Sequence, residues 1–100
     1  MEILKELGLT DTEIKLYTSL LELGSSSAGN LLTKSKLPNS TLHRDINSLI
    51  EKGLINFVKE GKRNLYQATD PNNFIDFIDD KKRRFLEILP KLKEKQNTLR

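Results

Sequence analysis

Residues 38–68 read PNSTLHRDINSLIEKGLINFVKEGKRNLYQA, and the spacing of apolar residues changes once within this segment. Up to Gly53 the spacing is helical, and one stripe of the helix carries Leu42, Ile46, Leu49 and Ile50. We therefore predict a helix over residues 39–53 that ends at Gly53, where a left-handed residue commonly stops a helix. Because the residue before Pro38 is disfavoured in a helix, Asn39 or Ser40 is expected to cap its start.

Beyond Gly53 the apolar residues alternate, which is the spacing of a β-strand. We predict strands over residues 54–60 and 65–68, joined by the four-residue loop Gly61–Asn64. A helix followed directly by a hairpin with a basic loop is the order of a winged helix-turn-helix. The predicted fold class is therefore α+β, mostly α.

Two more helices are predicted ahead of this segment. Thr10 and Glu13 have the spacing of a capping box, which begins a helix that ends at Gly24. Residues 28–35 form a second, shorter helix. Together with the later helix and hairpin, these elements are predicted to make a winged helix-turn-helix domain over residues 1–70.

Helical spacing resumes at Pro71, so residues 71–100 are predicted to form a long dimerisation helix. Pro90 is expected to kink this helix or to end it after Leu89. The apolar residues follow a heptad spacing, and the same helix of a second chain would cover the resulting seam. The predicted dimer interface consists of Phe74, Ile75, Ile78, Phe85, Ile88, Leu89, Leu92 and Leu99.

The polar face of the helix over residues 39–53 has side chains suited to the major groove of DNA. Arginine donates twice to guanine, asparagine pairs with adenine, and serine or threonine contacts bases or phosphates. The residues predicted to bind DNA from this helix are Asn39, Ser40, Thr41, His43, Arg44, Asn47 and Ser48. An ordinary solvated face is the plainer interpretation, and the basic hairpin that follows makes DNA binding the favoured one.

The predicted hairpin adds a second basic surface. Its candidates for contact with phosphates or the minor groove are Lys59, Lys62, Arg63 and Asn64. The denser basic run, residues 81–84, is interpreted as a charged helix face balanced by Asp76, Asp79 and Asp80. It would touch DNA beside the site only if the long helix began near the duplex.

The chain has 100 residues, about one domain, and its net charge of +3 is unevenly placed. Residues 1–38 carry −1, while residues 39–69 and 70–100 carry +2 each, which favours a polyanionic partner. No segment has the roughly 18 to 20 apolar residues of a membrane span, and the acidic start is unlike a signal peptide. Cysteine is absent, in agreement with an expected cytoplasmic location.

The residue patterns argue against an enzyme, a metal site and a bound cofactor. His43 is the sole histidine, so no histidine cluster exists for a transition metal. Ser40, His43 and Asp45 radiate from one helix and do not converge as a catalytic triad does. The glycines match neither a phosphate-binding loop nor a dinucleotide-binding fingerprint.

Several short motifs occur along the chain in a characteristic order: Leu7-Gly8-Leu9-Thr10, Leu20-Leu21-Glu22-Leu23-Gly24, Leu37-Pro38, Glu51-Lys52-Gly53-Leu54-Ile55, Gly61-Lys62-Arg63, Tyr66-Gln67-Ala68, Asp70-Pro71 and Leu89-Pro90. In their order and spacing these motifs resemble the TrmB-type transcription regulators of archaea. The resemblance implies a dimeric, DNA-binding winged helix that regulates transcription. It places Ser40, Thr41 and Arg44 at base-reading positions and Lys62 and Arg63 on the wing.

Larger members of that family continue into a sugar-sensing domain; we expect none in this chain, so the resemblance implies no carbohydrate response. We expect a sequence-specific transcription regulator that binds double-stranded DNA as a homodimer. Two alternatives stay open: an architectural or chromatin protein with little sequence preference, and a winged helix that binds other proteins. No residue pattern assigns a small-molecule effector.

Overall fold

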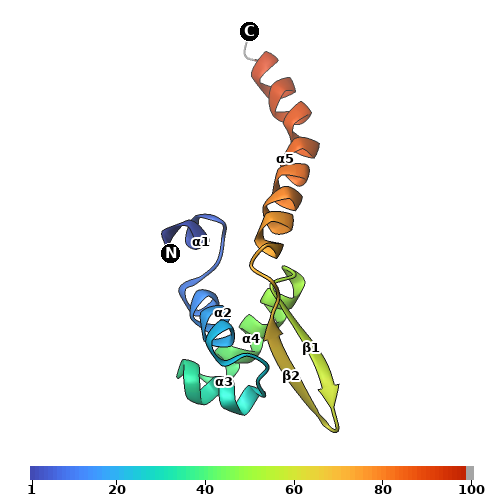
Figure 1. Ribbon diagram of the computed structural model, residues 1–100. Coiled ribbons are helices and arrows are strands. Elements are labelled where there is room, and N and C mark those ends of the chain that lie inside the picture. The colour runs from blue at the N-terminus through green and yellow to red at the C-terminus, as the bar shows by residue number, and fades with distance from the viewer. Residues whose placement is uncertain (99–100) are drawn as a thin grey trace.

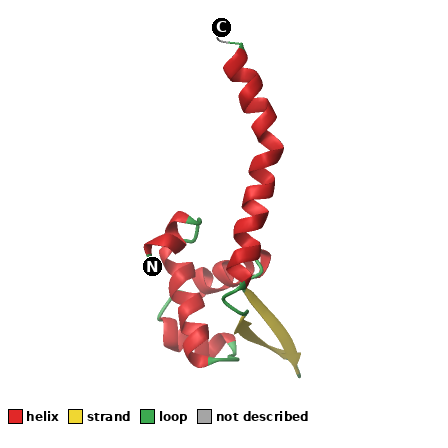
Figure 2. Cartoon of the chain, turned by 45° about the horizontal axis from the view of Figure 1, so that its top comes forward, coloured by secondary structure: helices red, strands yellow, loops and turns green. Residues whose placement is uncertain are grey.

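The computed structural model describes residues 1–98 and confirms a mostly helical chain with one small sheet (Figures 1 and 2). Its elements follow in the order α1 (Glu2–Glu6), α2 (Asp11–Leu23), α3 (Ala28–Ser35), α4 (Asn39–Glu51), β1 (Ile55–Glu60), β2 (Arg63–Ala68) and α5 (Asn73–Asn97). Helices α2, α3 and α4 form a cluster beside the hairpin of β1 and β2, and α5 projects away from both (Figure 1). This is the winged helix-turn-helix that the sequence predicted.

The core lies where α2, α3 and α4 meet. Its fully buried side chains include Leu16 and Leu20 from α2, Leu31 from α3, and Leu42 and Leu49 from α4. Burying each side chain of this size contributes about 1.5–3 kcal/mol to folding. The apolar stripe of α4 is thereby fixed against the other two helices, which directs the opposite face of α4 outward.

The hairpin is joined to the helices by its backbone as well as by its side chains. The amide of Ser26, between α2 and α3, donates to the carbonyl of Tyr66 on β2 at 2.8 Å. The amide of Tyr66 donates back to the carbonyl of Ser26, also at 2.8 Å. Leu54, just before β1, and Ile55, its first residue, are buried in the same core. The hairpin is therefore held at its base, and its tip extends away from the helices (Figure 1).

The predicted capping box at the start of α2 is confirmed. The amide of Thr10 donates to Glu13 Oε1 at 2.9 Å, and the amide of Glu13 donates to Thr10 Oγ1 at 3.2 Å. The predicted cap of α4 is wrong, because the N-cap is Pro38, whose carbonyl accepts from the amide of Leu42 at 2.9 Å. Pro38 already has the extended backbone that an N-cap needs, so Asn39 and Ser40 belong to the first turn.

The predicted four-residue loop of the hairpin is also wrong, because the turn contains only Gly61 and Lys62. Glu60 pairs with Arg63, and Lys59 pairs with Asn64. Arg63 and Asn64, both predicted to lie in the loop, therefore belong to β2. Gly61 has a φ of +64°, a left-handed conformation that glycine adopts without strain. Glycine at the first loop position is the preference of a tight type II′ turn, which closes the hairpin in two residues.

Helix α5 is continuous from Asn73 to Asn97, so Pro90 does not end it. It gives the molecule an elongated shape, with extents of 61 × 23 × 22 Å (Figures 1 and 2). Only its beginning joins the core: Phe77 is buried, and Phe74 meets the ring of Tyr17 edge-on at 5.2 Å. Phe74, predicted for the dimer interface, therefore packs within its own chain. No helix within residues 1–98 has the length and apolar character needed to cross a membrane.

Candidate nucleic-acid interface

The outer face of α4 carries most of the side chains predicted to meet DNA. Thr41 lies half-buried at its edge, and the exposed residues are Asn39, Ser40, His43, Arg44 and Asn47. The buried stripe of Leu42, Ile46 and Leu49 lies opposite. A helix anchored along one side can present the other side to a groove without deforming the domain. The exposure agrees with the sequence, while contact with DNA stays a prediction.

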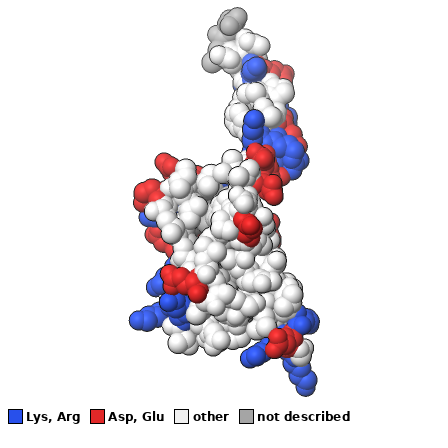
Figure 3. All heavy atoms as spheres, viewed as in Figure 1, with Lys and Arg blue, Asp and Glu red and all other residues white. Residues whose placement is uncertain are grey.

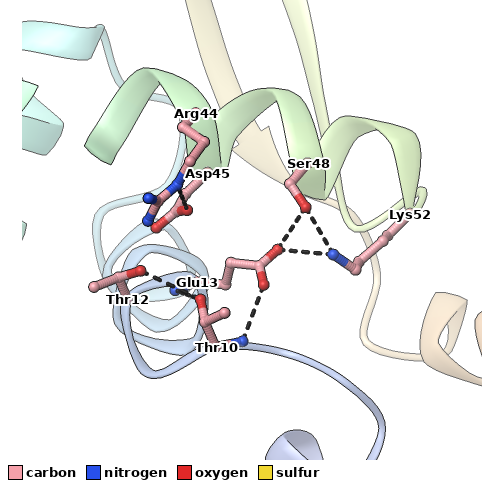
Figure 4. Close-up of polar contacts among 7 residues, drawn as sticks. All are labelled: Thr10, Thr12, Glu13, Arg44, Asp45, Ser48 and Lys52. Atoms are coloured by element: carbon pink, nitrogen blue, oxygen red, sulfur yellow. Dashed lines mark hydrogen bonds and ion pairs between the residues drawn. The ribbon is translucent and has the colours of Figure 1, made fainter. Parts of the chain in front are cut away.

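Arg44 is held by its neighbour on the same helix (Figure 4). Its Nε donates to Asp45 Oδ1 at 3.2 Å, although 68% of the Arg44 side chain is exposed. Asp45, in contrast, is buried. The two terminal nitrogens of the guanidinium form no hydrogen bond with any described residue, so the forked end is free to donate.

Ser48, predicted to bind DNA, already has two partners within the domain, and its contact with DNA stays a prediction. Its hydroxyl donates to Glu13 Oε2 at 2.7 Å and accepts from Lys52 Nζ, also at 2.7 Å (Figure 4). Lys52 Nζ donates in turn to Glu13 Oε2 at 2.9 Å. The sequence could not reveal this contact, because Glu13 lies on α2, 35 residues away.

Glu13 joins the start of α2 to the second half of α4. Burial by itself would raise the pKa of this carboxyl. Hydrogen bonds from Lys52, the Thr10 amide and Ser48 outweigh that effect, and the pKa lies below its ordinary value. Glu13 is therefore ionised at neutral pH and accepts charge-assisted bonds from both helices. This network fixes how α4 sits on α2 and hence where its outer face points.

The tip of the hairpin is basic (Figure 3). Lys59, Lys62 and Arg63 are exposed, as expected for residues that would meet phosphates. Asn64 is half-buried, and its Nδ2 donates to the hydroxyl of Tyr66 at 3.3 Å. Asn64 thus has a partner within the sheet, and contact of all four side chains with DNA stays a prediction.

A second basic surface lies over the end of α3, at the opposite corner of the domain in Figure 3. Its polar residues surround a shallow hollow together with Leu23, and they are Asn30, Thr33, Lys34 and Lys36. Lys34 pairs with Glu22 at 2.9 Å. In helix-turn-helix proteins the first helix of the motif crosses the DNA backbone, so these are candidate phosphate contacts. The feature of the sequence that points to this surface is the set of polar side chains within residues 28–36.

The basic run at residues 81–84 is largely balanced on its own helix. Asp80 pairs with Arg83 and, at 3.1 Å, with Arg84. The hydrogen bond from Arg83 is the main reason why the pKa of Asp80 is lowered. Lys81 Nζ lies 4.8 Å from the centre of the Phe77 ring. These contacts agree with a charged helix face, which is the interpretation that the sequence favoured.

Helix α5 exposes a row of apolar side chains along its length. Ile75, Ile78, Phe85, Ile88 and Leu92 each expose 41% to 57% of their surface. Leu89 is half-buried, and Leu86, which the heptad pattern did not select, is also exposed. Leu99 lies outside the described residues. No set of three potential metal-binding side chains comes together within residues 1–98.

Comparison with known proteins links this chain to a family. Residues 4–72 match the family described as "Sugar-specific transcriptional regulator TrmB". The chain is 31% identical over 78 residues to the HTH-type sugar sensing transcriptional regulator TrmBL1 of Pyrococcus furiosus. That match covers 78% of this chain and 23% of TrmBL1.

Solved structures agree with this match. The structure of TrmBL2, described as an archaeal chromatin protein with a novel mode of DNA binding, has a TM-score of 0.83 and 29% identity. The match covers 98% of this chain and 38% of TrmBL2, so the chain spans well under two thirds of either relative. A possible transcriptional regulator from Methanosarcina mazei shares the fold, with a TM-score of 0.70 and 22% identity over 88% of this chain and 80% of that one.

Proposed function

The chain belongs to the TrmB family of transcriptional regulators, and on this premise we propose that it is a sequence-specific regulator that binds double-stranded DNA as a homodimer. In this proposal residues 1–70 bind DNA and residues 71–100 hold two chains together. The observation that carries the proposal is the exposed polar face of α4, anchored from behind by the core and by Glu13.

The proposed mode of binding follows from the positions of α4 and the hairpin. The first half of α4 enters the major groove, where Ser40, Arg44 and Asn47 meet base edges. Lys59, Lys62 and Arg63 on the hairpin, together with Lys36 beside α3, neutralise phosphates and set the register. The helix supplies sequence preference, and the two flanking basic surfaces supply most of the salt-dependent affinity.

The exposed apolar row of α5 supports the homodimer. A lone helix would leave Ile78, Phe85 and Leu92 in water, and the same helix of a second chain would cover them. Two-fold symmetry of the protein would require a palindromic operator, with half-sites about 34–36 Å apart. Each half-site would receive one α4.

A chromatin protein is the second candidate, because the relative TrmBL2 is described as one. Both candidates use the same surfaces, and they differ in how strongly base edges contribute. A specific regulator prefers its operator over random duplex by about a thousandfold or more. A protein that coats DNA shows nearly equal affinity for all duplexes.

Selection of bound duplexes from a random pool tests the proposed function and separates it from this rival. The proposal predicts a recovered palindrome that competes about a thousandfold better than random duplex at physiological salt. Recovery of no common sequence, with salt-dependent binding retained, would favour the chromatin protein. Absence of any salt-dependent duplex binding would refute both and favour a protein-binding winged helix.

Arg44→Ala tests the reading of bases by α4. Loss of a bidentate contact to guanine should cost roughly 1–3 kcal/mol on the selected duplex and relax the preference at one base pair. Arg84→Ala is the matched control, because it removes the same charge from an exposed position on α5. Equal weakening by Arg44→Ala on selected and random duplexes would exclude base reading by this residue.

A further inference from the structure

We propose that Asp45 is a positioning residue, which fixes the guanidinium of Arg44 so that its forked end meets DNA already oriented. The proposal rests on the proposed role of Arg44 in binding DNA. It assigns a function to a carboxylate that would otherwise be out of place on a helix facing a polyanion.

Asp45 is an unusual residue for its location. Only 3% of its side chain is exposed, and Oδ1 accepts from Arg44 Nε at 3.2 Å. Oδ2 is buried and has no hydrogen-bond partner within residues 1–98. Buried polar atoms nearly always have a partner, and one that lacks a partner calls for an explanation. Packing of the core does not explain a carboxylate at this position, since an apolar side chain could be buried there equally well.

The buried charge makes detachment of Arg44 unfavourable. Within the described residues, Arg44 provides the one hydrogen bond that the carboxylate of Asp45 accepts. If the whole guanidinium of Arg44 moved away from Asp45 to bind DNA, the buried carboxylate would remain unpaired. An unpaired buried charge is strongly destabilising. Nε of Arg44 is therefore expected to stay on Asp45 when DNA binds, and DNA must be contacted by the terminal nitrogens.

A guanidinium whose Nε is bonded to Asp45 and whose terminal nitrogens are free suits base recognition. Arginine has five N–H donors in a rigid plane, and Nε uses only one of them. The four N–H groups at the forked end are the ones that make a bidentate contact to guanine. A long side chain normally loses rotamer freedom on binding, and a pair formed beforehand reduces that loss. Asp45 thus favours the specific contact without touching DNA itself.

Electrostatics alone predicts the opposite effect of removing this carboxylate, which makes the proposal testable. Asp45→Asn takes away a negative charge beside the duplex, so a purely electrostatic role would tighten binding to every sequence. Positioning predicts that the variant loses preference for the selected duplex over random duplex by about two- to tenfold. Asp79→Asn, at an exposed position on α5, is the matched control and should leave this preference unchanged.

The decisive experiment is a double-mutant cycle of Asp45→Asn and Arg44→Ala, measured as affinity for the duplex selected by the wild-type protein and for random duplex. The loss of preference caused by Asp45→Asn should disappear when Arg44 is already alanine. An equal loss in both backgrounds, or tighter binding to both duplexes, would overturn the positioning role. A wild-type protein that binds no duplex would overturn the proposed function first, and this inference with it.

A measurement on the wild-type protein covers the case in which Asp45→Asn does not fold. The Nε–H resonance of Arg44 should exchange slowly with water in the free protein and stay protected after addition of the selected duplex. The resonances of its terminal nitrogens should change on binding. Rapid exchange of the Nε–H group in the complex would show that Arg44 leaves Asp45, and the proposal would be wrong.

Discussion

Glu13 shows how one buried side chain can determine the placement of a whole helix. It completes the capping box of α2 and also accepts hydrogen bonds from Ser48 and Lys52 on α4. The capping box is visible in the sequence because its two residues lie three apart. The contacts of Glu13 with α4 are not visible in the sequence, because Ser48 and Lys52 lie 35 and 39 positions away from it.

Glu13→Gln should destabilise the protein in a pH-dependent manner. The folded-state pKa of Glu13 lies below its ordinary value of 4.5, so ionised Glu13 stabilises the fold above that pH. This contribution is lost as the pH falls through the folded-state pKa. We expect a loss of about 2 kcal/mol at about pH 7, where charge-assisted hydrogen bonds are removed. The difference between variant and wild type should shrink well below pH 4.5.

Urea unfolding at several pH values measures this effect. Glu22→Gln is the control, because it removes the same charge from an exposed pair with Lys34 and should cost less than about 1 kcal/mol. A Glu13→Gln variant whose deficit stayed constant from neutral to acid pH would show that packing, rather than ionisation, explains the role of Glu13.

At the scale of elements, the sequence predicted helices better than the hairpin. Gly53 and the four apolar residues of α4 define that helix and its end without help from the rest of the chain. The predicted loop of the hairpin is too long, because the apolar pattern places the start of the second strand at Leu65, its first apolar residue. Arg63 and Asn64 are polar residues of an exposed sheet, where neither burial nor alternation marks the start of a strand.

The tight turn makes Gly61 a point of conformational sensitivity. Gly61→Ala should destabilise the hairpin by about 1–2 kcal/mol, because φ is +64° and a Cβ atom disfavours that conformation. Open space surrounds the position, so any loss comes from the backbone alone. Gly29→Ala is the control, since Gly29 lies in α3 with ordinary helical geometry, and it should be neutral or stabilising. Thermal unfolding that ranked the two variants in the reverse order would contradict the turn geometry.

The proposed contacts of the hairpin with phosphates predict how strongly salt weakens DNA binding. Lys62→Ala and Arg63→Ala should each reduce the slope of log affinity against log salt by about one unit, because each removes one phosphate contact. Their effect should be similar on selected and random duplexes. Lys15→Ala, on the exposed side of α2, provides a control with the same loss of charge. Slopes that matched the wild-type value in all three variants would place the hairpin outside the interface.

At the scale of the whole molecule, the heptad spacing identified the exposed face of α5 but not where the helix leaves the domain. Phe74 is partly buried and packs against the core of its own chain, whereas Ile75 and Ile78 are exposed. The apolar spacing runs without a break from core to surface, so a sequence pattern gives no boundary between them. Only the packing of Phe74 against Tyr17 shows which residues belong to the protomer itself.

Dimerisation through α5 predicts the effect of charging the exposed apolar row. Replacement of both Phe85 and Leu92 by lysine should convert the protein to monomers, as measured by sedimentation, because two desolvated apolar contacts become four like charges in the paired helices. Lysine at Leu21 and Leu23, two exposed apolar residues of α2, is the matched control and should leave the dimer intact. A wild-type protein that sediments as a monomer at high concentration would refute the dimer.

Mapping of backbone amide resonances on addition of the selected duplex tests most directly whether α4 is the surface that reads DNA. The account predicts that the shifted resonances gather in three places: the end of α3 around Lys36, residues 39–47 of α4 and residues 59–63 of the hairpin. The rest of the domain and the second half of α5 should change little. Shifts confined to α5, or an undisturbed α4 in a protein saturated with duplex, would contradict it.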